Sequence, residues 1–226
     1  MVVEGRSDHL SLWRPGDLSW TRIMVPTCKN ISDVVYFSGR LYTVSYGGYV
    51  RVYDVGGYEV KTHLITQIVA WIEDRYYILG SLGSLFVVAR RASVIVPVKY
   101  DCERIPPRFI TVEDEDARFM YRTNDFIVFQ IDLDAYKATP TRDLGDRAFF
   151  LGASASLSVQ ASQFTGIRFN HIYFTDTNWG ACLYFEHGGG LDMGVFNLAD
   201  GSIQPQYDGV SLSRFCPPIW VTPYPC

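Results

Sequence analysis

A phrase of six residues, written more than once in the chain, decides the fold. It reads Gly39-Arg-Leu-Tyr-Thr-Val44 at its first occurrence and Gly83-Ser-Leu-Phe-Val-Val88 about 44 residues later. A weaker copy is Asn170-His-Ile-Tyr-Phe-Thr175. Each copy places β-branched and aromatic residues directly after a turn residue, which is the pattern of a strand that follows a tight turn.

Further strand-like phrases recur on both sides of these copies. One strand-like phrase precedes each copy, at 36–38, 78–80 and 150–152. Two more follow each copy: the first lies at 52–55, 128–131 and 195–198, and the second lies near 60–65, 138–144 and 202–204. The chain therefore divides into three four-stranded units at about 33–66, 75–144 and 147–206, with insertions at about 91–124 and 177–191. A period near 40–50 residues with four short strands per unit is typical of a β-propeller.

Strand fragments flank the three units. Leu10–Trp13 and Ser19–Ile23, joined by the turn Pro15-Gly-Asp17, resemble the last two strands of a unit whose first two are absent, and Ile219–Thr222 is a lone strand candidate. No window shows a convincing helical period. We therefore predict an all-β fold, a partial or small β-propeller of four-stranded antiparallel blades, with about three complete units plus partial blades at each end.

Composition excludes several classes of function. The 226 residues are 48% hydrophobic and carry a formal net charge of −4, so there is no basic excess to bind nucleic acid. The start of the chain has no apolar stretch typical of a signal peptide, and no run approaches the length of a membrane span. The five cysteines are scattered, which indicates reduced thiols and a cytoplasmic or nuclear protein.

Several longer strings carry a resemblance to a known family. They are Trp13-Arg-Pro-Gly-Asp17, the stretch Asp143–Gly152, the stretch Gly194–Ile203, and Pro217-Pro-Ile-Trp220. In this order they resemble the plant F-box-associated domain of the KIB type, long catalogued as a domain of unknown function. The resemblance implies a β-propeller that serves as the substrate-receptor part of plant F-box proteins, which recruit targets for ubiquitylation.

The chain departs from that family at its start. No helical, Leu- and Pro-rich F-box segment precedes residue 9. We therefore expect a single KIB-type propeller domain over 1–226, truncated on its N-terminal side and without an F-box. A Skp-type adaptor is then not expected as a partner, whereas a protein substrate or partner is.

No motif in the chain predicts catalysis, a cofactor or a metal. His187-Gly-Gly-Gly190 is similar to the oxyanion loop of esterases, but Ser154 lacks the Gly-x-Ser-x-Gly setting of their nucleophile. The acidic run Glu113–Asp116 lacks the spacing of a calcium loop, and no histidine has neighbours at metal-ligand spacing. We therefore expect no catalytic residues, no bound cofactor and no bound metal.

Partner-binding residues are expected in the loops. Trp179 stands in a loop outside any strand, where aromatic residues are enriched at binding hot spots. His187 follows in a Gly-rich loop, and Asp114 and Glu115 are suited to a basic patch on a partner. We predict a non-catalytic protein-binding propeller with these four residues at its binding surface. The alternatives are a truncated paralogue with no independent activity and a propeller hydrolase.

Overall fold

The computed structural model describes most of the chain. The described residues are 2–6, 9–13, 15–24, 30–57, 60–70, 75–92, 96–98, 118–120, 123–177, 192–205 and 219–220. All regular elements among them are β-strands except one short 3₁₀ helix, Ala161–Gln163. The prediction of an all-β fold is therefore confirmed.

The chain forms two compact units. The first consists of Met1–Arg91 and Ile127–Thr141, and the second of Ala92–Phe126 and Arg142–Cys226. Three sheets lie in the first unit, and β12 (Thr123–Asp132) runs from the second unit into the first. The second unit contains the fourth sheet and a short pair of strands.

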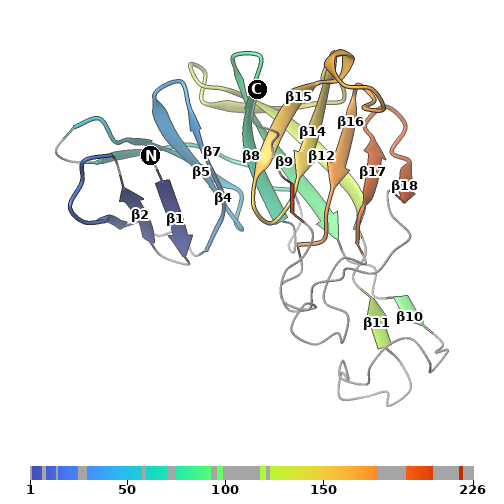
Figure 1. Cartoon of the computed structure of the whole chain (residues 1–226), viewed down its shortest axis with the longest axis horizontal. Coiled ribbons are helices and arrows are strands. Elements are labelled where there is room, and N and C mark those ends of the chain that lie inside the picture. Colours follow the sequence, from blue (N-terminus) through green and yellow to red (C-terminus); the bar gives the residue numbers. More distant parts are fainter. Residues whose placement is uncertain are drawn as a thin grey trace. The chain divides into compact units, whose positions relative to one another are not determined.

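The second sheet in chain order shows the repeated pattern most simply. Its strands are β4 (Ile31–Phe37), β5 (Arg40–Ser45), β6 (Tyr49–Asp54) and β7 (Lys61–Gln67), each antiparallel to the next (Figure 1). Ser38 and Gly39 close the first hairpin, and both have a positive φ, as a two-residue turn of type I′ requires. The phrase Gly39–Val44 is thus the end of a turn followed by β5.

The third sheet repeats this order, with β12 next to β9. Its order is β13 (Lys137–Thr141), β12, β9 (Ser84–Ala92) and β8 (Arg75–Ser81). Leu82 and Gly83 occupy the turn that Ser38 and Gly39 occupy in the second sheet. The insertion between β9 and β12 contains a short antiparallel pair in the second unit, β10 (Val96–Val98) and β11 (Arg118–Met120). Four-stranded sheets of the expected kind are therefore present.

The first sheet has one strand more than the sequence pattern indicates. Its strands are β1 (Val2–Arg6), β2 (His9–Trp13) and β3 (Thr21–Met24), paired antiparallel in chain order. The pattern of flanking fragments predicts β2 and β3 but not β1, because the sequence of β1 includes Glu4 and Gly5 and lacks a clear apolar alternation.

The fourth sheet, in the second unit, departs from a purely antiparallel blade. Its order is β15 (Ser156–Gln160), β14 (Arg147–Leu151), β16 (His171–Phe174), β17 (Gly194–Asn197) and β18 (Ile203–Pro205). β14 and β16 are parallel, because the chain between them first returns along β14 as β15 and then crosses over through the 3₁₀ helix. At the far end of the chain, Ile219 and Trp220 belong to no strand; the remainder of Ile219–Thr222 lies outside the described residues.

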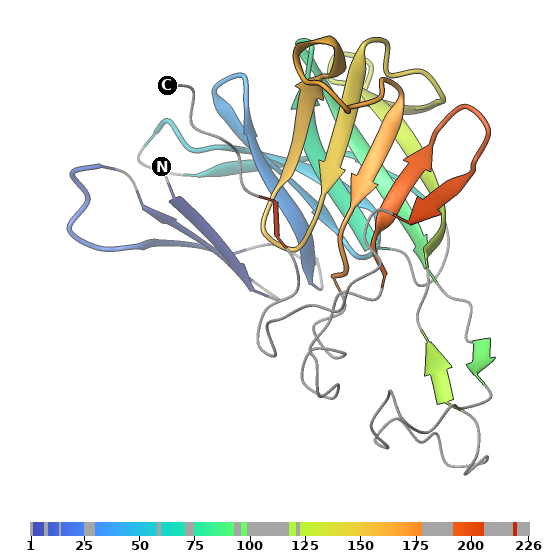
Figure 2. The ribbon, with the colours of Figure 1, turned by 45° about the vertical axis from the view of Figure 1, so that its right-hand side comes forward.

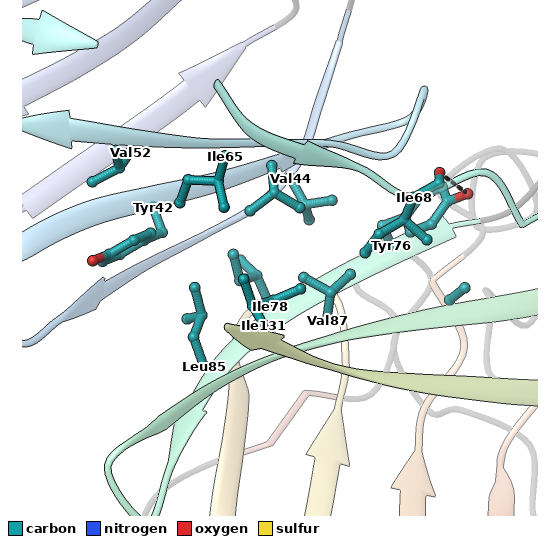
Figure 3. Close-up of a cluster of buried hydrophobic side chains, with 12 residues drawn as sticks. Tyr42, Val44, Val52, Ile65, Ile68, Tyr76, Ile78, Leu85, Val87 and Ile131 are labelled. Atoms are coloured by element: carbon teal, nitrogen blue, oxygen red, sulfur yellow. Dashed lines mark hydrogen bonds between the residues drawn. The ribbon is translucent and has the colours of Figure 1, made fainter. Parts of the chain in front are cut away.

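In the first unit the apolar core lies between neighbouring sheets. One cluster joins the second and third sheets, with Val44 and Val52 from one side and Ile78, Val87 and Ile131 from the other (Figure 3). A second cluster joins the first and second sheets through side chains of β2, β3, β5, β6 and the residue that follows β6. Its buried members are Leu10, Leu12, Ile23, Leu41, Tyr53 and Val55. Face-to-face burial between successive sheets is how propeller blades are held together.

The aromatic residues of the repeated phrases mostly join these cores. Tyr42, Tyr53, Tyr173 and Phe196 are buried, whereas Tyr36 on β4 is exposed. In the second unit, Phe126 packs against Phe174 and Phe196, with ring centroids 5.1 and 5.2 Å apart. On the other face of the fourth sheet, Phe150 stacks on Tyr173 and meets the edge of Trp220. Most of these strand aromatics thus stabilise the sheets, whereas Tyr36 faces solvent.

Candidate partner-binding surface

The four residues predicted to bind a partner lie outside the described residues. Trp179 and His187 stand between β16 and β17, and Asp114 and Glu115 stand between β9 and β12. In both cases the segment joins two neighbouring strands of one sheet. The strands that frame the segments are described, so the points at which the segments leave and rejoin the fold are defined.

A buried carboxylate ties the ends of the two segments together. Asp192, only 5% exposed, ends the segment that holds Trp179 and His187, and Thr123 ends the segment that holds Asp114 and Glu115. The backbone N–H of Thr123 donates to both carboxylate oxygens of Asp192, at 2.9 and 3.0 Å, and its hydroxyl donates at 2.7 Å. Charge-assisted bonds of this kind are among the stronger ones in proteins. Both predicted binding segments therefore rejoin the fold at one fixed point.

The other end of the Trp179 segment is also buried. Thr175, Asp176 and Thr177 follow β16 and are all less than 5% exposed. The N–H of Thr175 donates to the carbonyl of Leu151 at 3.0 Å, which holds this end against β14. Motif searches could not have found these anchoring residues, because Asp and Thr after a strand are usually turn residues on the surface.

The described residues offer no catalytic geometry at the positions considered. Ser154 is exposed in the turn between β14 and β15, so a strand follows it and not the helix that a nucleophile elbow requires. Asp132 accepts hydrogen bonds from the N–H groups of Asp134 and Ala135, the role of a turn-forming residue that its position predicts. Within the described part of the chain, no group of three or more His, Cys, Asp or Glu could hold a metal ion.

Exposed apolar side chains gather at strand ends. In the first unit Tyr46 is exposed directly after β5. Further exposed apolar residues occupy turns or the start of a strand connection; they are Leu18, Trp20, Leu82 and Tyr136. Loops at strand ends are where a rigid scaffold presents binding residues.

In the second unit, the connection between β15 and β16 presents two phenylalanines. Phe164 and Phe169 are exposed, while Ile167 between them packs on the fourth sheet. The hydroxyl of Tyr173 accepts a hydrogen bond from the N–H of Arg168 at 2.9 Å. Asn170, whose φ is +57°, accepts a hydrogen bond from Leu144 and donates one to the carbonyl of Arg142. This connection is therefore held in one conformation with both phenyl rings in solvent.

Successive four-stranded sheets that bury an apolar core between them are the architecture of a β-propeller domain. Residues 1–197 match the sequence model of the family described as KIB1-4 beta-propeller. The chain belongs to this family. The resemblance that the strings around Trp13, Asp143 and Gly194 indicate is thereby confirmed.

Curated relatives are F-box proteins of Arabidopsis thaliana. The chain is 26% identical to F-box protein At4g35733 over 88% of its own length and 48% of that protein. It is 27% identical to the putative F-box protein At3g25750, over 89% of this chain and 48% of that protein. A further relative, F-box/kelch-repeat protein At1g64840, is 23% identical over 80% of this chain and 42% of that protein. The chain spans about half the length of the curated relatives it matches.

Proposed function

We propose that this chain is a non-catalytic protein-binding propeller, the substrate-receptor part of an F-box type of protein. The observation that carries the proposal is the membership of the KIB1-4 family, whose curated relatives here are named F-box proteins. A receptor needs a rigid scaffold with adaptable connections. The cores between sheets and the Asp192–Thr123 anchor are consistent with that requirement.

The partner is a protein that the chain would present for ubiquitylation. The proposed contacts are Trp179 and His187 in one segment, and Asp114 and Glu115 in the other. An aromatic side chain supplies contact area, whereas the carboxylates attract a basic patch and speed association. We propose no cofactor and no catalytic residue, and a single propeller domain over 1–226.

We also propose that the protein acts in the cytoplasm or nucleus. In the part of the chain that the structure describes, no helix has the length and apolar character needed to cross a bilayer. The dispersed cysteines fit a reducing compartment.

Affinity purification from plant cells tests the proposal. The tagged chain should retain one protein reproducibly, and a variant with a disrupted core, Ile78→Asp, should lose it. Recovery of chaperones alone with the folded chain would count against a receptor. Turnover of a generic ester by the wild type, lost in Ser154→Ala, would favour a hydrolase instead. Recovery of a Skp-type adaptor would contradict the prediction that no such adaptor binds this chain.

A further inference from the structure

Two bulky residues have a backbone conformation that their side chains disfavour. Among the described residues, five that are not glycine have a φ in the left-handed region. Three of them, Asn30, Ser38 and Asn170, are small polar residues, and Asn above all is enriched there because its short side chain can bond locally. The other two are Leu82 at +49° and Tyr136 at +56°. Neither side chain can offset the steric cost by a local hydrogen bond of that kind.

Both residues occupy turns of the third sheet. Leu82 and Gly83, with φ values of +49° and +74°, form the two-residue turn between β8 and β9, a position for which Asn-Gly or Asp-Gly is preferred. Tyr136 is the last residue of the turn between β12 and β13. Turn chemistry therefore explains the glycine but neither Leu82 nor Tyr136.

The two turns lie at the same end of the sheet. The side-chain amide of Gln130, near the end of β12, donates to the hydroxyl of Ser84, the first residue of β9, at 3.1 Å. Figures 1 and 2 show the two turns at one end of β8, β9 and β12. Strands are about 4.8 Å apart, so neighbouring hairpins are centred about 10 Å from each other. Three residues of extended chain span that distance.

Burial does not account for either side chain. Leu82 is 74% exposed and Tyr136 is 58% exposed. A strained turn residue whose side chain lies in solvent contributes little to the fold, and such strain is found preferentially where a function requires it. Exposed apolar side chains at neighbouring tips also offer the kind of area that protein contacts use.

The charges around the two tips indicate the partner's chemistry. Asp132 and Asp134 are exposed on the turn that carries Tyr136, and Lys137 follows directly, so negative charge is in excess there. A complementary segment combines apolar side chains with a Lys or Arg. We propose that Leu82 and Tyr136 form a second protein-contact surface, which binds an extended apolar peptide segment carrying a basic residue.

This surface consists of other residues than the one proposed above. The segment with Asp114 and Glu115 leaves β9 at the end of the strand opposite to the Leu82 turn. The inference rests on the proposed function, since it assigns a second contact to a protein-binding chain. The two claims can nevertheless fail independently, because they concern different residues.

Substitution by asparagine tests the inference. Leu82→Asn and Tyr136→Asn install a residue that tolerates the left-handed conformation, so each should raise the thermal midpoint, by about 2–4 °C. The binding probe is a phage-displayed library of random peptides of about 12 residues, selected on the immobilised chain, with enriched peptides synthesised for fluorescence anisotropy. Val69→Asn is the matched control, because it removes an exposed apolar side chain elsewhere in the same unit.

The expected result is enrichment of peptides that combine aromatic or aliphatic residues with Lys or Arg. Their affinity should fall about tenfold or more in the double variant and stay unchanged in the Val69→Asn control. The inference is overturned if the double variant binds the peptides with unchanged affinity, if the enriched peptides are acidic, or if no peptide is enriched. It is also overturned if the substitutions lower the thermal midpoint. If the double variant retains the natural partner in affinity purification as the wild type does, the proposed function holds whatever the peptides show.

Discussion

At the scale of single residues, polar side chains form hydrogen bonds between sheets that the composition alone does not reveal. Ser32 and Asp33 on β4 bond the backbone of β8: the hydroxyl of Ser32 accepts from the N–H of Tyr76, and Asp33 accepts from the N–H of Ile78. The first strand of the second sheet thereby covers the edge of the first strand of the third. An edge paired in this way is protected from joining another chain.

Removing the charge of Asp192 should loosen the anchor of the two segments that are proposed to bind a partner. Asp192→Asn leaves one oxygen to accept the hydrogen bonds that Thr123 now donates to two. We expect the free energy of unfolding to fall by about 1.5–3 kcal/mol, the range for bonds to charged groups. Urea denaturation measures the change, and Asp132→Asn on an exposed turn should change it by less than about 0.5 kcal/mol.

The carboxylate of Asp146 should titrate below the usual range for an aspartate. The hydroxyl of Ser162 donates to it at 2.6 Å, and this bond is the main cause that lowers the pKa of Asp146. Because the folded pKa is lowered, the associated stabilisation is present at neutral pH and is lost as the pH falls through that pKa, below about pH 4.

Carboxyl NMR titration checks the shift. Ser162→Ala should raise the pKa of Asp146 toward its ordinary value. Asp200, whose pKa is lowered chiefly by the hydroxyl of Ser202, is the internal control and should not move. A pKa of Asp146 that is the same with and without the Ser162 hydroxyl would show that the bond does not form in solution.

At the scale of strands and turns, the repeated phrase predicts β5 and β9, since a Gly in a tight turn and an apolar alternation are both local signals. It cannot predict β15 or the parallel pairing of β14 with β16. Ser156–Gln160 alternates only weakly, and the direction in which β14 pairs depends on the crossover that follows it. Whether two strands pair parallel or antiparallel is a property of the sheet and cannot be predicted from the sequence of one strand.

Gly48 shows where a turn depends on a close approach of two backbones. Its φ is +72°, and a Cβ atom would lie 1.9 Å from the carbonyl oxygen of Ile68. Gly39 has a φ of +81° but no atom within 4 Å of such a Cβ. Gly39→Ala should therefore cost only the conformational term, about 1–2 kcal/mol.

Gly48→Ala should cost more than about 3 kcal/mol, beyond the usual range for a single substitution, because the hydrogen bond from Ile68 must also shift. Chemical denaturation of both variants provides the comparison. Equal losses at the two positions would mean that the backbones of Gly48 and Ile68 do not approach each other so closely in solution.

At the scale of the whole molecule, the sheets are held by apolar clusters that no single sheet contains. Ile78 is fully buried between the second and third sheets. Ile78→Ala should lower the free energy of unfolding by about 2–5 kcal/mol through lost burial and a cavity. Val69→Ala, at a position 84% exposed, should change it by less than about 0.5 kcal/mol. If the two variants unfold alike, the cluster is not the core of this unit.

The sequence predicts the fold class and family better than the binding surface. The strand periodicity and the Gly-containing turns occur in several copies, so a weak signal in one copy is supported by a clearer signal in another. Trp179 and His187 are proposed from loop position alone, since no spacing rule describes a protein-binding surface. The buried Asp192, by contrast, is visible only once Thr123 lies beside it, because the two are far apart in the chain.

Cross-linking mass spectrometry on the tagged protein in plant cells tests the central claim, that a protein partner binds the connections between strands. The account predicts one reproducible partner, with cross-links concentrated in the segments around Asp114 and Trp179 or in the turns of Leu82 and Tyr136. Cross-links to chaperones alone, or cross-links scattered evenly over the chain, would contradict it.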